Sequence, residues 1–148
     1  MNILQNIVKK IMLPCQFKNN ADFDNNIYLD TFGAAEGRVE IHMGVTDVAV
    51  GSVAETEPLQ LTECDTTNGN FTDIDGACLA AAIPSTKSNK IYAIDIPMDR
   101  AHGRYVKVKT PHAGNGTGAN MTIIGVLAKL DNGPANAEER GFEEHVIP

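Results

Sequence analysis

Apolar and polar side chains alternate along three segments in the second half of the chain, and each segment is bounded by Gly, Pro, Asn or Asp. The segments are Ile91–Met98, Arg104–Thr110 and Met121–Leu130. Successive side chains of a strand point to opposite faces of a sheet, so this alternation is typical of antiparallel strands. The pattern predicts an all-β fold, an antiparallel β-sandwich, in which a jelly roll is favoured over an immunoglobulin-like sandwich.

The same alternation predicts which faces lie in the core. The apolar face of the first segment consists of Tyr92, Ile94, Ile96 and Met98. In the second segment, Val106 and Val108 oppose a basic face. In Met121–Leu130 both faces are apolar enough to be covered, so we expect this strand between two sheets or under a neighbouring subunit.

Earlier segments show the same punctuation with less regular alternation. The expected strands are Ile27–Phe32, Val39–Met43, Val45–Ala54, a possible edge strand in Glu55–Thr62, and Ala77–Ile83. A long acidic connection, Cys64–Gly76, separates the last two. Together with the later segments this gives roughly seven or eight strands, as in a sandwich of two sheets.

The first fourteen residues have a different period. Apolar side chains recur at the spacing of an amphipathic helix, and Pro14 ends the pattern. We expect an N-terminal helical or extended arm over residues 1–14, which docks on a neighbour or packs on its own sandwich. The arm's candidate partner-contact residues are Ile3, Leu4, Ile7, Val8 and Ile11. The expected domain then spans residues 15–134, and residues 135–148 form a charged C-terminal tail.

Composition narrows the function classes. The formal net charge of −7 disfavours nucleic-acid binding, which needs a basic surface to neutralise phosphates. No segment approaches the ~20 apolar residues of a membrane span, and the N-terminus lacks the pattern of a secretory signal. The three cysteines, Cys15, Cys64 and Cys78, have no CxxC spacing, which fits a reducing compartment.

Motifs for catalysis and ligand binding are incomplete. The four histidines have no metal-ligand spacing, and no GxSxG motif surrounds a serine. The loop Gly114–Asn120 leads into a strand rather than a helix, so it lacks the helix N-terminus of phosphate-binding loops. Asp65, Asp73 and Asp75 form only part of a calcium loop. We therefore expect no enzyme activity, no catalytic residue, no cofactor and no metal.

A family resemblance runs from Ile27 to Leu130. It follows the order of the segments VAVGS, PLQLTECDTT, IYAIDIP, GRYVKVKT, GTGAN and GVLAKL. This order resembles the head decoration or cement proteins of tailed bacteriophages, and more narrowly the jelly-roll cement family of Bordetella-type podophages. The residues at the places of the family pattern are Gly103, Tyr105, Val106, Gly116, Thr117 and Leu127. The N-terminal segment departs from the pattern, and Lys107 stands where arginine is common.

The resemblance implies a non-enzymatic virion protein on the exterior of the phage head, made in the host cytoplasm. Its implied partners are the major capsid protein and copies of itself, as a homotrimer. The alternative is a carbohydrate- or receptor-binding β-sandwich module of a phage fibre or surface protein. Sugar sites usually use exposed aromatic platforms, and this chain has no Trp and only Tyr28, Tyr92 and Tyr105.

Overall fold

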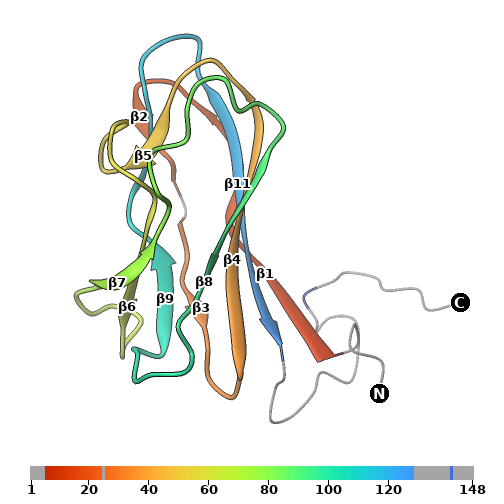
Figure 1. Cartoon of the computed structure of the whole chain (residues 1–148), viewed down its shortest axis with the longest axis vertical. Coiled ribbons are helices and arrows are strands. Elements are labelled where there is room, and N and C mark those ends of the chain that lie inside the picture. Colours follow the sequence, from red (N-terminus) through yellow and green to blue (C-terminus); the bar gives the residue numbers. More distant parts are fainter. Residues whose placement is uncertain (1–5, 25, 129–140, 142–148) are drawn as a thin grey trace, which may run out of the picture.

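The computed structural model describes residues 6–24, 26–128 and 141, and those residues form strands without an α-helix. Figure 1 shows the strands along the chain. Their bounds are β1 (Ile7–Lys18), β2 (Ala21–Asp22), β3 (Leu29–Asp30), β4 (Glu36–Thr46), β5 (Val50–Ser52), β6 (Gln60–Cys64), β7 (Thr72–Cys78), β8 (Ile91–Asp95), β9 (Tyr105–Val108), β10 (Pro111–Ala113) and β11 (Ala119–Ala128).

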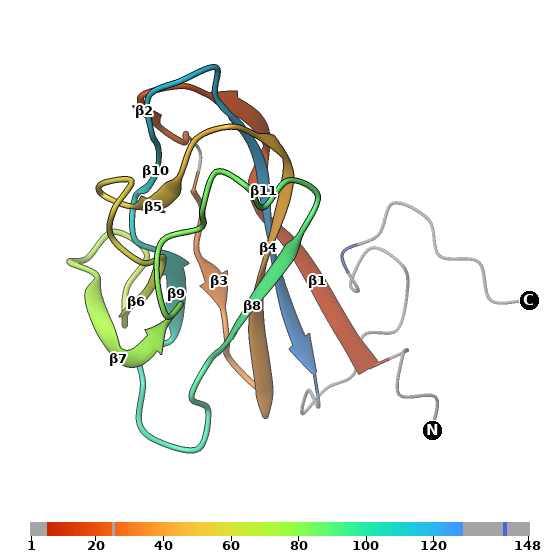
Figure 2. The ribbon, with the colours of Figure 1, turned by 45° about the horizontal axis from the view of Figure 1, so that its top comes forward.

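The strands form two layers (Figures 1 and 2). One layer is a four-stranded sheet in the order β1-β11-β4-β8, here called the long sheet. The facing layer consists of two short sheets in the orders β2-β10-β5 and β3-β9-β6-β7. All strand pairs are antiparallel. The predicted all-β class, an antiparallel β-sandwich, is confirmed.

The core lies between the layers and follows the period of two. Along β11, buried and half-buried side chains alternate without interruption. The largest fully buried side chains of the two layers are Met12, Leu13, Leu29, Ile41, Leu59, Leu61, Ile83, Met121 and Ile123. The predicted core positions Ile94, Ile96, Val106 and Val108 are buried as well. The alternation therefore identified the inward faces of β8 and β9.

The central strand β11 is covered on one face only within the described residues. Its inner side chains, such as Met121 and Ile123, are buried, whereas Ile124 and Val126 on the outer face are half-buried. The strand lies between β1 and β4 in the long sheet, not between two sheets. Cover by a neighbouring subunit stays a prediction.

Of the two forms expected for the N-terminal arm, helical and extended, the helical form is wrong from Ile7 onward. Residues 7–18 form β1, which pairs with β11 along its whole length. The register has two irregularities, and the first, a bulge between Ile11 and Leu13, places both Met12 and Leu13 in the core. Pro14 sits at the second irregularity of this edge strand, where no ladder hydrogen bond is required of it. The sheet thus begins before the expected domain boundary at residue 14.

Three smaller expectations also differ from the structure. The acidic connection 64–76 contains most of β7, which ends at Cys78. Ile83 makes only an isolated bridge to Val50 instead of ending a strand. The glycine-rich loop is shorter than expected because β11 already begins at Ala119. The expected C-terminal tail, residues 135–148, lies outside the described residues except for Gly141.

Candidate interaction surface

The side of the long sheet that points away from the core is the candidate interaction surface, here called the outer face. Strand register places its side chains in rows, one of which joins Ile11, Ile124 and Glu40 across β1, β11 and β4. The residues that define the outer face are Ile7, Lys9, Ile11, Glu36, Arg38, Glu40, His42, Ile91, Ala93, Asp95, Thr122, Ile124, Val126 and Ala128.

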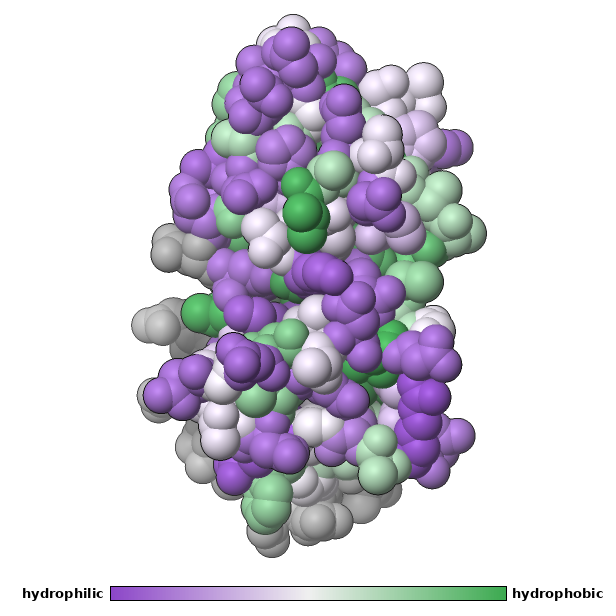
Figure 3. Space-filling model, turned by 90° about the vertical axis from the view of Figure 1, so that its left-hand side faces the viewer, coloured by the Kyte–Doolittle hydropathy of each residue, from purple (hydrophilic) through white to green (hydrophobic). Residues whose placement is uncertain are grey.

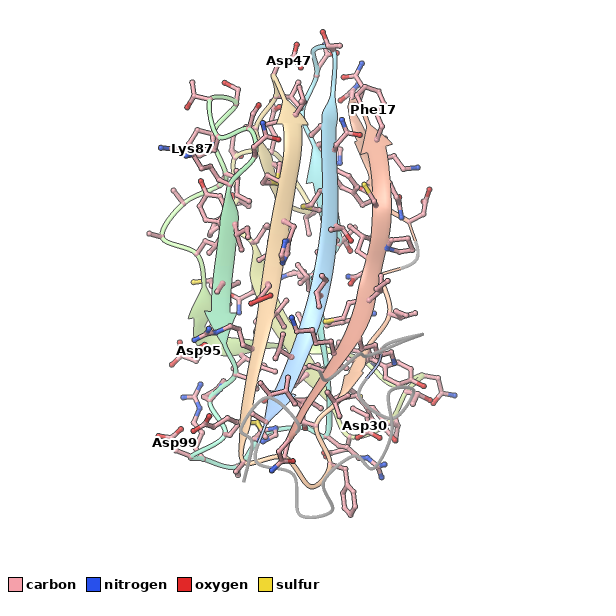
Figure 4. The ribbon with its side chains drawn as sticks, turned by 90° about the vertical axis from the view of Figure 1, so that its right-hand side faces the viewer. Phe17, Asp30, Asp47, Lys87, Asp95 and Asp99 are labelled. Atoms are coloured by element: carbon pink, nitrogen blue, oxygen red, sulfur yellow. The ribbon has the colours of Figure 1, made fainter. Side chains whose placement is uncertain are left out.

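Two large aliphatic side chains are exposed on the outer face. Ile11 in β1 is 59% exposed and Ile91 in β8 is 64% exposed, although both are large aliphatic residues. Phe17, 53% exposed, lies at the far end of β1 (Figure 4). The side of the molecule formed by the short sheets is mostly hydrophilic, with hydrophobic side chains in small groups (Figure 3). Ile11 is paired with Ile124 of β11, so an apolar group forms along β1 and β11, as at many interaction sites. Ile91 lies apart from this group, on the opposite edge strand β8.

A hollow of about 490 Å³ lies at the end of the outer face where β8 ends. Its apolar lining includes Pro97, Met98, Val126 and Ala128. Its charged lining consists of Glu36, Arg38, Glu40, Asp95 and Asp99. The hollow therefore combines an apolar floor with a rim on which carboxylates outnumber the one arginine.

A second hollow of about 310 Å³ adjoins the first. Asp95, Pro97 and Asp99 line both. The second is completed by Asp75, Gly76, Ala77 and Arg100. The Arg100 guanidinium donates a hydrogen bond of 2.6 Å to the backbone carbonyl of Asp75. The end of β8 is thus flanked on both sides by hollows with acidic linings.

Ion pairs hold part of this charge in place. The Arg38 Nε donates to the Asp95 Oδ1 at 2.8 Å, across the pairing of β4 with β8, and this contact raises the pKa of Arg38. The His42 Nε2 and Glu40 Oε1 atoms lie 3.3 Å apart on the same strand, β4. Both contacts are on the solvent side of the sheet, where an ion pair adds little to stability. They hold Arg38 and His42 against neighbouring carboxylates of the outer face.

The five predicted contact residues separate in the structure. Ile7 and Ile11 lie on the outer face of β1. Val8 points to the other side and packs against the core. Ile3 and Leu4 lie outside the described residues. The predicted contact residues that the structure describes therefore do not share one helical face. They lie on the two opposite faces of strand β1.

The glycine-rich loop before β11 binds a carboxylate of its own chain. The backbone N–H of Gly118 donates to the Asp47 Oδ1 at 2.9 Å, and the Thr117 N–H donates to the same carboxylate at 3.1 Å. These bonds lower the pKa of Asp47. The Gly116 N–H donates to the Asn19 side chain at 2.9 Å. The loop amides that could have bound an anion are thus already occupied.

Other candidate sites do not assemble. Asp73, one of the possible calcium ligands, pairs with Lys109 at 3.0 Å, and His112 contacts Asp22 at 2.7 Å. Within residues 6–24, 26–128 and 141, no group of three or more His, Cys, Asp or Glu side chains is placed to hold a metal ion. Within the same residues, no helix is long and apolar enough to cross a membrane.

The tyrosines do not form an open aromatic platform. Tyr28 and Tyr105 contact each other edge to face, with ring centroids 4.9 Å apart, and the Lys10 ammonium lies over the Tyr28 ring. Tyr92 is half-buried and packs against the core. The rings of Tyr28 and Tyr105 therefore contact each other, and the ring of Tyr92 lies on the inner face of β8.

Sequence reasoning missed most of the outer face. The alternation in β8 did assign Ile91, Ala93 and Asp95 to the face away from the core. Their neighbours Glu40 and Val126 come from strands far apart in the sequence, and only strand pairing brings them together. The chain matches no protein-family model and shows no significant similarity to a curated protein.

Proposed function

We propose that this chain is a non-enzymatic virion structural protein, a capsid decoration or cement protein that binds the outside of a tailed-phage head. Its partner would be the major capsid protein, whose subunit contacts it stabilises. The observation that carries the proposal is the outer face of the long sheet, which leaves large aliphatic side chains such as Ile11 and Ile91 exposed. The resemblance of the central segments to phage cement proteins supports the same reading.

The strand order supports a jelly roll for this protein. If β2 and β3, β5 and β6, and β9 and β10 are each taken as one interrupted strand, the chain has two facing sheets of four strands. The first and last strands, β1 and β11, are then neighbours in the long sheet. Eight strands in two sheets with such long connections are typical of jelly rolls.

The proposed mechanism is mechanical. Burial of the outer face against coat subunits contributes about 25 cal/mol per Å² of apolar area, from which the cost of association is subtracted. Each copy would bind the coat with modest affinity. Many copies bound to one capsid lattice would together stabilise the head. Because the chain carries a formal net charge of −7, attraction to locally basic coat surfaces would weaken as salt rises.

We also propose that the protein assembles as a homotrimer. Light scattering on a size-exclusion column, at low and moderate salt, measures the mass in solution. A trimer at both salt concentrations is the expected result. A monomer would contradict the trimer and would favour the alternative of a carbohydrate- or receptor-binding module, which a glycan-binding screen would then test.

The function itself is tested on particles. The chain, carrying an epitope tag, is expressed in its native genetic background, and tailed-phage particles are purified by density gradient. Immunogold electron microscopy should place the tag on the exterior of intact heads. Label on tail fibres would instead favour the receptor-binding alternative, and particles without the chain would refute a virion role.

A further inference from the structure

The edge of β8 carries backbone groups that no other strand of the described residues uses. The Ile96 N–H donates to Gly37 and the Met43 N–H donates to Lys90, which fixes the phase of the ladder between β8 and β4. In that phase Ile94 and Tyr92 bond to β4, whereas the N–H and C=O groups of Ile91, Ala93 and Asp95 point away from it. None of these six groups has a hydrogen-bond partner in the described part of the chain.

The opposite edge of the long sheet is not equally open. The Met12 carbonyl in β1 accepts a hydrogen bond of 2.8 Å from the Ile27 N–H. Gly141 lies so close to the Lys9 carbonyl that a Cβ at this position would collide with it. The outward groups of β1 are thus partly covered by other segments of the same chain, which leaves β8 as the open edge of the long sheet.

The usual protection of an edge strand is weak at β8. Within Ile91–Asp95 there is no proline, no lysine and no bulge. Of the three side chains on its outer face, Ile91 and Ala93 are exposed and apolar, and Asp95 at the end of the strand is the one charged residue. Such an edge is a template for a further strand. Figure 4 shows β8 at the side of the long sheet, with Asp95 and Asp99 beside its lower end.

The two hollows at the end of β8 indicate the chemistry of that strand. A strand added beside β8 and running past Asp95 would send alternate side chains toward the larger and the smaller hollow. Their combined charged lining is Glu36, Arg38, Glu40, Asp75, Asp95, Asp99 and Arg100. Five carboxylates thus face two arginines, and Arg38 is already paired with Asp95.

We infer that the β8 edge binds an extended, lysine- or arginine-rich segment of a partner protein by strand addition. The segment's backbone would bond to Ile91, Ala93 and Asp95. Its aliphatic stems would pack on the apolar lining while its cations meet the carboxylates. The inference rests on the proposed function for the source of the segment, the coat protein.

Two occupants from this protein fit less well. Residues 129–148 are rich in Asp and Glu, so their charge has the same sign as the hollows. A second copy would present its own β8 edge, Ile91–Asp95, which contains Asp95 and no Lys or Arg. The hollows attract a basic segment, and neither of these two occupants supplies one within the paired strand.

The test uses the full-length, ¹⁵N-labelled protein and a synthetic peptide of alternating lysine with valine or threonine. Binding should shift the amide signals of Ile91, Ala93 and Asp95 and slow their hydrogen exchange. A peptide with glutamate in place of lysine, and one with N-methylated backbone amides, should both fail to bind. Equal binding of the N-methylated peptide, or binding without changes at those three amides, would overturn strand addition.

Variants locate the site. Ala93→Pro removes one outward N–H but none of the bonds to β4, and it should abolish peptide binding. Asp99→Asn should weaken binding several-fold, whereas Asp65→Asn in the exposed loop after β6 serves as the matched control and should leave it unchanged. If Ala93→Pro fails to fold, Asp99→Asn and the N-methylated peptide still decide the question. Equal affinity of Asp99→Asn and Asp65→Asn would refute the acidic contribution.

The same measurements separate this inference from the proposed function. A protein that binds heads but not the peptide keeps its capsid role and loses the strand-addition site. A protein that binds the peptide at β8 but is absent from particles keeps the site and loses the role. Protection of the three amides in a dimer without peptide would show that a second copy occupies the edge, and would overturn the inference.

Discussion

Gly125 of β11 and Leu29 of β3 touch across the core, because Gly125 has no side chain: a Cβ there would lie 2.8 Å from the Leu29 Cδ1. The Met12 sulfur of β1 would be 3.0 Å from the same Cβ. Leu29 and Met12 are both fully buried. The contact fixes how closely the long sheet and the short sheet containing β3 approach each other.

Gly125→Val should therefore destabilise the sandwich by about 1–3 kcal/mol, since the added atoms overpack a filled site. Urea denaturation followed by circular dichroism measures the change in the free energy of unfolding. Ala93→Val, on the exposed face of β8, is the control and should stay close to the wild type. Equal stability of the two variants would show that the layers can separate at Gly125 without cost.

Substitutions on the two faces of β1 should differ in what they impair: head binding on the outer face and stability on the inner face. Ile11→Asp changes an exposed side chain, so the free energy of unfolding should fall by about 1 kcal/mol or less, while head binding is lost. Leu13→Ala opens the core and should cost about 2–5 kcal/mol. Thermal melts and a head-binding assay measure both. Head binding by Ile11→Asp at wild-type affinity would remove the outer face of β1 from the proposed interface.

The pairing of Asp30 with Arg104 predicts a pH dependence. The Arg104 Nε and Nη2 atoms each donate to the Asp30 carboxylate at 2.8 Å, and these bonds lower the pKa of Asp30 below its usual 3.8. A carboxyl whose pKa is lower in the folded state adds stability above the unfolded pKa. That contribution disappears as the pH falls through the lowered folded pKa.

The wild type should thus exceed Asp30→Asn in stability at neutral pH, and the difference should shrink below pH 3.8. The effect should be small because both side chains are partly exposed to solvent. Urea denaturation of both proteins across this pH range measures it. A difference that stays constant with pH would mean that the ionised carboxylate is not what stabilises this contact.

The turn before β11 should not tolerate a side chain at residue 118. Gly118 has φ of +137°, and a Cβ there would lie 2.7 Å from the Lys18 carbonyl. Gly118→Ala should cost on the order of 1–3 kcal/mol. Asn115→Ala, in the same loop, is the control. A thermal melt of Gly118→Ala that matches this control would show that the backbone can relax without penalty.

The sequence determined the fold class and the inward faces of several strands. Ile94 alternates with exposed residues, and Val106 and Val108 alternate with half-buried ones, because a pleated strand imposes a period of two that is local. Burial at these positions could therefore be predicted before any pairing was known. The outward assignment of Ile91 and Ala93 followed from the same local rule.

The tertiary structure decided the N-terminal segment and the interaction surface. Side chains four residues apart share one face in a strand as well as in a helix, so Ile7 with Ile11 and Val8 with Met12 fit both periods. Pairing with β11, more than a hundred residues later, selects the strand. The hollows beside β8 likewise combine residues of β4, β8 and β11. Pairing between distant strands depends on contacts across the whole chain, which the local pattern of side chains does not encode.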